Sequence, residues 1–155
     1  MNKILQAESI EKNNCFHLGI YISCKCPGYR ILIKKDRILV VDDDPESRYI
    51  LMRLLSQSDY EVETAKNGKE AVEQLKRAKF NLVLTDWVMP EMDGLELLGY
   101  VKSQYPDISV IMVTLKASSE SKTEVLELGA EGLLSKPYTK DQLLTIVSES
   151  LKKKK

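Results

Sequence analysis

Short apolar segments with β propensity alternate with amphipathic segments from Arg37 to Leu151, and this alternation limits the possible folds more than any other feature of the chain. The apolar segments are Ile38–Val41, Tyr60–Thr64, Phe80–Leu84, Ile108–Thr114 and Leu133–Leu134. Each is followed by a stretch with apolar residues at helical spacing, at about 45–57, 68–78, 95–104, 118–128 and 141–151. Strict alternation with crossovers this short predicts a parallel sheet with helices on both faces. For 155 residues, the doubly wound α/β sheet is the natural candidate.

The first 35 residues do not follow this pattern. We therefore expect an N-terminal extension over residues 1–35, poorly ordered or atypical, ahead of one folded domain over residues 36–153. All three cysteines lie in the extension together with a histidine: Cys15, His17, Cys24 and Cys26. These side chains could form a zinc site, but structural zinc sites usually space their ligand pairs more widely, which favours incidental cysteines. A natural chain that starts near Lys34 is a further alternative.

The formal net charge of zero hides an uneven distribution. Residues 1–35 carry six basic and two acidic side chains, and the last four residues are lysines, so residues 36–151 hold 13 basic against 21 acidic side chains, a net charge of −8. Such an acidic domain argues against a nucleic-acid surface. No apolar stretch reaches the ~18 residues needed to span a bilayer, and the N-terminus has no signal-peptide pattern. A body without cysteines fits a reducing compartment, so a cytoplasmic location is expected, with no membrane or nucleic-acid partner.

Polar side chains stand where the predicted strands end. Asp42 and Asp43 follow the first strand, Asp86 the third, Thr114 the fourth and Lys136 the fifth. In a parallel sheet these ends share one edge, so three carboxylates, a hydroxyl and an ammonium converge there. The carboxylates would repel one another without a cation, and their oxygen atoms suit a hard divalent ion, with Mg²⁺ the best fit. A carboxylate beside a metal and a lysine can attack a phosphoryl group.

Each of these residues also has an ordinary structural explanation. Asp42 and Asp44 could simply cap a helix, Lys136 could be a solvated charge, and Thr114 could be an ordinary strand residue. Their joint occurrence at the strand ends favours a functional site.

The motifs ILVVDDDP, NLVLTDWVMPEMDGLELL, VIMVT and SKPY, in this order, resemble the receiver domain of bacterial two-component response regulators, the CheY-like family. The resemblance covers residues 37 to about 151. It implies a flavodoxin-like (βα)5 fold with strand order 2-1-3-4-5. It also implies a protein that is not a conventional enzyme, but a phosphoacceptor that catalyses its own phosphorylation and dephosphorylation.

The resemblance assigns a role to each residue of the site. It implies that Asp86 accepts the phosphoryl group and binds Mg²⁺ together with Asp43 and the backbone carbonyl of Val88, while Asp42 acts through a water molecule. It also implies that Lys136 pairs with the phosphoryl group, that Thr114 hydrogen-bonds it when the domain switches, and that the Lys136–Pro137 peptide bond is cis.

Two positions depart from the family pattern, and a third lies where the family tunes the rate of phosphoryl hydrolysis. Leu115 stands where a small residue is usual, and it could narrow access for the phosphodonor. Leu133 stands where an aromatic side chain often moves inward on activation, so we expect a muted or rewired conformational response. The apolar Val88 cannot orient an attacking water, so we expect a long-lived aspartyl phosphate.

The resemblance implies a histidine kinase or a histidine phosphotransfer protein as the phosphodonor. Because no recognisable output module follows, we expect a stand-alone receiver that docks a target protein through its fourth helix, fifth strand and fifth helix. One alternative is a pseudo-receiver that binds partners without phosphorylation, which Leu115 and Leu133 keep open. An aspartate-nucleophile phosphohydrolase is disfavoured, because such enzymes need a second acid two residues after the nucleophile, where Val88 stands.

Overall fold

The computed structural model describes residues 35–115 and 118–153, without the side chains of residues 119–121. The described residues form one compact unit. The expected extension, with Cys15, His17, Cys24 and Cys26, lies outside the described residues apart from its last position.

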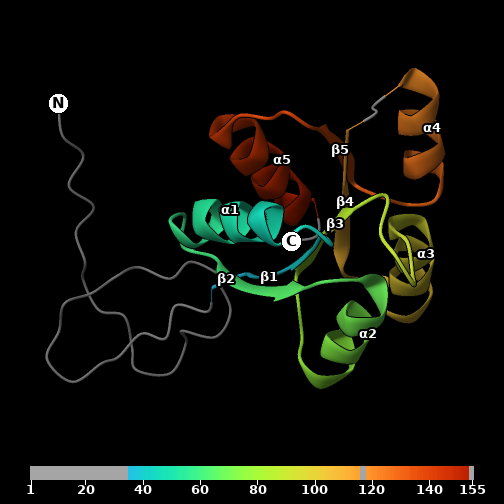
Figure 1. The fold of residues 1–155 in the computed structure, drawn as a ribbon, viewed down its shortest axis with the longest axis horizontal. Helices are drawn as coiled ribbons and strands as arrows, with labels where there is room; N and C mark the ends of the chain where they lie inside the picture. Colours follow the sequence, from blue (N-terminus) through green and yellow to red (C-terminus); the bar gives the residue numbers. More distant parts are fainter. Residues whose placement is uncertain (1–34, 116–117, 154–155) are drawn as a thin grey trace, which may run out of the picture. The chain divides into compact units, whose positions relative to one another are not determined.

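Within residues 35–115 and 118–153, five parallel strands form one sheet, in the order β2-β1-β3-β4-β5 (Figure 1). Their bounds are β1 Arg37–Val41, β2 Glu61–Ala65, β3 Leu82–Asp86, β4 Ser109–Thr114 and β5 Gly132–Ser135. The sequence-based expectations of a doubly wound parallel sheet and of this strand order are both confirmed. The apolar side chains of β1, β3 and β4 are buried on both faces of the sheet, as continuous apolar runs in parallel strands require.

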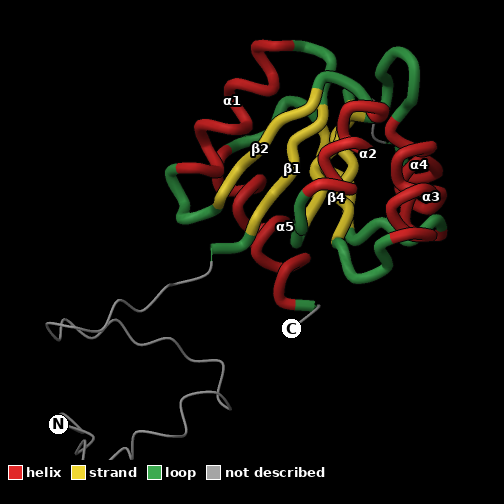
Figure 2. The backbone as a smooth tube through the Cα atoms, turned by 90° about the horizontal axis from the view of Figure 1, so that it is seen from below, coloured by secondary structure: helices red, strands yellow, loops and turns green. Residues whose placement is uncertain are grey.

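In the part of the chain that the structure describes, five helices cover the two faces of the sheet (Figures 1 and 2). Their bounds are α1 Pro45–Ser56, α2 Gly68–Arg77, α3 Gly94–Gln104, α4 Ser119–Glu127 and α5 Lys140–Lys152. Helices α1 and α5 share one apolar core with the strand residues Ile38 and Val40, whereas α2, α3 and α4 share the other with Leu39 and Val41. The alternation of side chains along β1 thus divides between the two cores, as the period of a strand dictates. No helix of the described residues has the length and hydropathy to cross a membrane.

Local signals explain where the helices near the carboxyl edge begin. Asp44 caps α1 through hydrogen bonds from the backbone N–H groups of Glu46 and Ser47, and Pro45 occupies the first helical position, as its fixed φ allows. Asp93 and Glu96 form a capping box at the start of α3. The loops after β1 and β3 are therefore short and end at defined points, which restricts the positions of the residues that they carry.

Parallel pairing aligns the carboxyl ends of the strands. Asp86 lies beside Val113 in the register of β3 and β4, so Thr114 follows directly beyond it. On the other side, Thr114 pairs with Ser135, which precedes Lys136. The Lys136–Pro137 peptide bond is cis, as the resemblance implied. The strand-end residues singled out in the sequence therefore do share one edge of the sheet.

Candidate functional site

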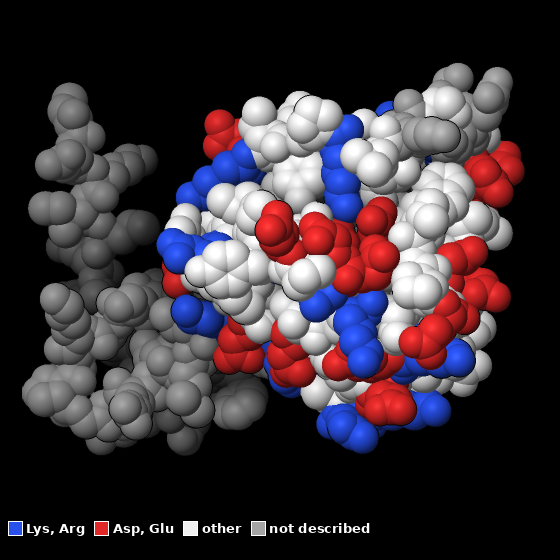
Figure 3. Space-filling view, viewed as in Figure 1, with Lys and Arg blue, Asp and Glu red and all other residues white. Residues whose placement is uncertain are grey.

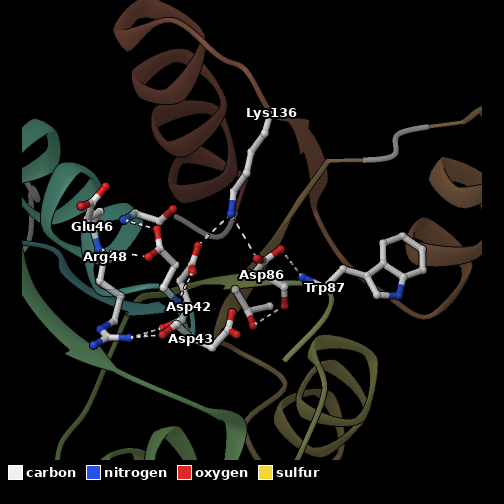
Figure 4. A network of polar contacts seen from close by, with 10 residues as sticks. Asp42, Asp43, Glu46, Arg48, Asp86, Trp87 and Lys136 are labelled. Carbon is white, nitrogen blue, oxygen red and sulfur yellow. Dashed lines mark hydrogen bonds and ion pairs between the residues drawn. The ribbon is translucent and has the colours of Figure 1, made fainter. Parts of the chain in front are cut away.

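Three carboxylates gather at this edge. Asp42 and Asp43 follow β1, and Asp86 ends β3; one carboxylate oxygen from each lies within 4.8 Å of the others (Figure 4). Asp43 is exposed, whereas Asp42 is 1% exposed. Figure 3 shows acidic side chains gathered near the middle of this face of the molecule. Oxygen donors at this spacing fit a small hard divalent cation, which commonly takes one or two carboxylates and keeps several waters.

Lys136 provides the positive charge of the site. Its ammonium lies 2.8 Å from Asp42 Oδ2 and 3.1 Å from Asp86 Oδ2, and its side chain is 16% exposed (Figure 4). Burial acts to lower the pKa of this ammonium, but the hydrogen bonds and negative charges of Asp42 and Asp86 outweigh burial and raise the pKa above its ordinary value. Lys136 therefore keeps its charge at neutral pH and connects the two carboxylates.

Asp42 is the most deeply buried acid of the group. Its Oδ1 accepts a hydrogen bond of 2.9 Å from the backbone N–H of Asp44, and its Oδ2 accepts the bond from Lys136. Burial raises the pKa of Asp42, even though both hydrogen bonds act to lower it. One positive charge thus does not fully compensate the burial of this carboxylate.

Asp86 stands at the end of a central strand with its carboxylate held at both oxygens. Oδ1 accepts a hydrogen bond of 2.8 Å from the backbone N–H of Trp87, and Oδ2 accepts the bond from Lys136. Its side chain is 16% exposed, so it is shielded but still reaches solvent. Gly94 lies close behind it, since a Cβ there would collide with the Asp86 carbonyl. The first helical residue of α3 must therefore be glycine, because no side chain fits there.

The other predicted site residues lie around this centre in different environments. Thr114 ends β4 and is 5% exposed, and its carbonyl accepts a hydrogen bond of 2.7 Å from the Lys136 backbone N–H. Val88 and Leu115 follow β3 and β4, and their side chains are 77% and 78% exposed. Leu133, on β5, is partly buried against the core shared by α2, α3 and α4.

Arg48, which the sequence analysis did not select, secures the loop after β1. Its Nη1 donates to the carbonyl of Asp42 at 2.6 Å and to that of Asp43 at 3.0 Å (Figure 4). The guanidinium thereby fixes the main chain that carries two of the three acids. A sequence signal did exist, since an arginine one turn after a helix N-cap can reach back to the preceding loop.

Comparison with known proteins identifies the family. The protein-family model of the response regulator receiver domain matches residues 38–148, which is most of the domain described above. The chain therefore belongs to the receiver domain family of two-component response regulators, and the resemblance stated from its motifs is confirmed.

Individual relatives agree with this assignment. The chain is 42% identical over 114 residues to the transcriptional regulatory protein ZraR of Klebsiella oxytoca, covering 74% of this chain and 26% of ZraR. It is 35% identical over 119 residues to the response regulator MprA of Mycobacterium leprae, covering 77% of this chain and 52% of MprA. The chain thus spans about a quarter to a half of the length of these relatives. Among solved structures, a CheY-like receiver domain protein from Methanospirillum hungatei matches with a TM-score of 0.74 at 35% identity, covering 78% of this chain and 97% of that one.

Proposed function

We propose that this chain accepts a phosphoryl group on Asp86 in a Mg²⁺-dependent reaction. The observation that carries the proposal is the arrangement of Asp42, Asp43 and Asp86 within 4.8 Å of one another, with Lys136 bonded to two of them. Three acids beside a single lysine leave negative charge that a divalent cation can neutralise. Of the three, Asp86 alone ends a central strand and contacts Lys136 while remaining partly accessible.

In this proposal Asp43, Asp86 and the backbone carbonyl of Val88 would hold the magnesium ion, with Asp42 acting through a water molecule; the spacing of the three carboxylates supports it. When bound, Mg²⁺ would supply positive charge against the oxygens of the incoming phosphoryl group. An oxygen of Asp86 attacks phosphorus, and the bond from phosphorus to the donor breaks with its electron pair going to the donor. Lys136, already 3.1 Å from Asp86, then pairs with the transferred group, and the Thr114 hydroxyl donates to it.

The phosphodonor in this proposal is a phosphohistidine of a histidine kinase or of a phosphotransfer protein. The imidazole leaves as phosphorus bonds to Asp86, so the transfer is balanced and needs no further co-reactant. The chain provides the metal site and the lysine for transfer and for later hydrolysis, but it releases no altered substrate of its own. This supports a signalling phosphoacceptor rather than a conventional enzyme.

The lifetime of the phosphorylated state follows from Val88. Its side chain is 77% exposed beside Asp86 and carries no hydrogen-bonding group, so it cannot orient a water for attack on the aspartyl phosphate. We expect slow hydrolysis and a faster loss of phosphate in Val88→Asn. A longer lifetime in that variant would contradict this assignment.

The output surface in this proposal is the face formed by α4, β5 and α5. Two large apolar residues, Leu126 in the last turn of α4 and Leu128 just after the helix, are 43% and 48% exposed and are available to a protein target. Leu133 of β5 packs against the core of the domain, so no aromatic side chain there can switch between buried and exposed positions. We therefore expect phosphorylation to change this face only modestly, measured as small amide shifts along α4 and β5.

The intact mass of the protein after incubation with acetyl phosphate and Mg²⁺ tests the proposal. We expect one phosphoryl adduct, absent in Asp86→Asn and after chelation by EDTA. Asp107→Asn, which changes an exposed aspartate in the turn before β4, is the matched control and should keep the adduct. If the wild type gains no adduct from acetyl phosphate or from a phosphohistidine donor while it binds Mg²⁺, the proposal fails and a scaffold role is favoured.

A further inference from the structure

The loop between β3 and α3, residues 87–93, determines where the Val88 carbonyl lies. The base of the loop is closed by a hydrogen bond of 2.9 Å from the Gly94 N–H to the Trp87 carbonyl, and Met89 is buried in the core. The Val88 side chain is 77% exposed and does not anchor its own backbone. The part of the loop around Pro90–Met92, its far side, therefore needs contacts of its own if the Val88 carbonyl is to keep one position.

That far side contains a strained turn. Glu91 has φ of +69°, a region that side chains with a Cβ rarely adopt. Across it, the Met92 N–H donates to the Pro90 carbonyl at 2.9 Å, the bond of a γ-turn in its rare form. Such a conformation persists only where the surrounding structure holds it.

Asn67, from the start of α2, stabilises this turn through a hydrogen bond to Glu91. It is 5% exposed and donates from Nδ2 to Glu91 Oε1 at 2.7 Å. The neighbouring Gly68 N–H donates to the Met92 carbonyl at 3.3 Å, and a Cβ on Gly68 would lie 2.7 Å from the Met92 side chain. The start of α2 is thus hydrogen-bonded to the loop at two successive residues, Glu91 and Met92.

The Asn67 amide does more than a helix cap requires. Its Oδ1 accepts the capping hydrogen bond from the Glu70 N–H at 2.8 Å, and aspartate or serine could do the same. Aspartate has no proton to donate, and serine has a single polar atom for both bonds, whereas the Asn67 amide accepts through Oδ1 and donates to the Glu91 carboxylate through the separate Nδ2. The choice of asparagine is therefore explained by the loop, and not by the helix.

We propose that Asn67 is a positioning residue of the metal site, holding the β3–α3 loop through Glu91 so that the Val88 carbonyl faces the cation. This inference rests on the proposed function, because it concerns the same Mg²⁺ site. Asn67 touches neither the metal nor the phosphoryl group, so it acts only through the loop.

The test is a Mg²⁺ titration followed by the fluorescence of Trp87, the only tryptophan of the sequence and a direct neighbour of Asp86. Asn67→Asp keeps the cap but places a carboxylate against Glu91. We expect the dissociation constant for Mg²⁺ to rise about tenfold, the lower end of the range for residues that support metal ligands. The added negative charge alone would strengthen cation binding, so this change has the opposite sign to a simple charge effect.

Rescue comes from exchanging the two groups. In Asn67→Asp with Glu91→Gln, the new glutamine amide can donate to the new aspartate, and we expect Mg²⁺ affinity to return to within about twofold of the wild type. Lys69→Met is the control, because Lys69 contacts the same Glu91 carboxylate at 3.4 Å from an exposed position and should leave affinity unchanged.

The outcomes separate this inference from the function on which it rests. Wild-type affinity in Asn67→Asp, or a rescue of thermal stability without a rescue of Mg²⁺ affinity, would overturn the positioning role and leave the metal site standing. A wild type without saturable Mg²⁺ binding would overturn both the inference and the Mg²⁺-dependent function. Tenfold weakening with rescue in the double variant supports the inference.

Discussion

Two partly buried lysines at opposite edges of the sheet form ion pairs of similar geometry. At the amino edge of β4 and β5, Lys102 Nζ lies 2.9 Å from Glu131 Oε1, with the side chains 18% and 12% exposed. At the carboxyl edge, Lys136 Nζ lies 2.8 Å from Asp42 and 3.1 Å from Asp86, and its side chain is 16% exposed. The distances and exposure of the two lysines are nearly the same, but the number of acids is not.

The two edges differ in the charges that their ion pairs bring together: Lys102 pairs with one carboxylate, whereas Lys136 pairs with two. Glu131 accepts from Lys102 and from the Val110 N–H at 2.6 Å, while Lys102 also donates to the Ile108 carbonyl at 2.9 Å. In this ion pair an ammonium meets a carboxylate, and the surrounding main chain provides further hydrogen bonds, which is how a structural pair is built. At the carboxyl edge, three acids face one lysine. The difference indicates that the amino edge serves stability and that the carboxyl edge is prepared for a cation and an anionic group.

Breaking the pair of Lys102 and Glu131 should have the largest effect on stability. Lys102→Met removes the ammonium that pairs with the largely buried Glu131 carboxylate, and we expect the free energy of unfolding to fall by about 2–3 kcal/mol. Urea unfolding measures this, with the exposed Lys76→Met as control, which should stay within about 0.5 kcal/mol of the wild type. A loss of Mg²⁺ affinity in Lys102→Met would show that the two edges are not independent.

Removing Lys136 should lower the free energy of unfolding less than removing Lys102, and it should change Mg²⁺ affinity. Without metal, Lys136→Met removes the ammonium that pairs with Asp42 and Asp86, and we expect a loss of about 1–2 kcal/mol in the free energy of unfolding. The same change removes a positive charge that competes with the cation, so Mg²⁺ should bind roughly fivefold more tightly. Weaker Mg²⁺ binding, measured by Trp87 fluorescence, would mean that Lys136 organises the acids and does not compete for them.

Removing one acid should have opposite effects at the two edges. Asp43→Asn relieves repulsion among three carboxylates, so we expect the metal-free protein to gain about 0.5–1 kcal/mol in stability. Glu131→Gln, in contrast, should lose stability, because it removes the carboxylate that pairs with the partly buried Lys102. If both variants changed the free energy of unfolding in the same direction, the proposed difference between the two edges would be contradicted.

The smallest effect expected is a dependence on pH. Burial raises the pKa of Asp42, so the folded protein binds this proton more tightly than the unfolded chain does. For this group, stability without metal rises as pH falls through its raised pKa toward the ordinary value of 3.8. The same proton weakens the charge that attracts Mg²⁺, so Mg²⁺ affinity should begin to fall at a pH above that of an ordinary aspartate. Affinity that stays constant down to about pH 4 would contradict this.

The alternation of apolar and amphipathic segments was enough to predict a doubly wound parallel sheet and the residues at its carboxyl edge, whereas the strand order came from the family resemblance. Parallel strands bring their ends together whatever the details of packing, so Asp42, Asp86, Thr114 and Lys136 could be placed at one edge from their positions in the sequence. The segment 1–34 lies outside the described residues, and the roles given to the site residues stay predictions until they are tested.

The supporting contacts could not be predicted in this way. Asn67 and Glu91 are 24 residues apart, and Lys102 and Glu131 are 29 apart, so their meeting depends on how helices and loops pack on the sheet. The positive φ of Glu91 also has no signal in its residue type, because glutamate does not favour that conformation. A sequence pattern places backbone elements, whereas these contacts depend on the direction of individual side chains.

The central claim is that the carboxyl edge holds an unbalanced acidic site for Mg²⁺, and the dependence of the unfolding free energy on Mg²⁺ concentration tests it most directly. Above its dissociation constant, Mg²⁺ should stabilise the wild type by about 1.4 kcal/mol for each tenfold rise in concentration. Lys102→Met should show the same slope from a lower starting value, and Asp43→Asn should show little or none. A flat line for the wild type, or an undiminished slope in Asp43→Asn, would contradict the account.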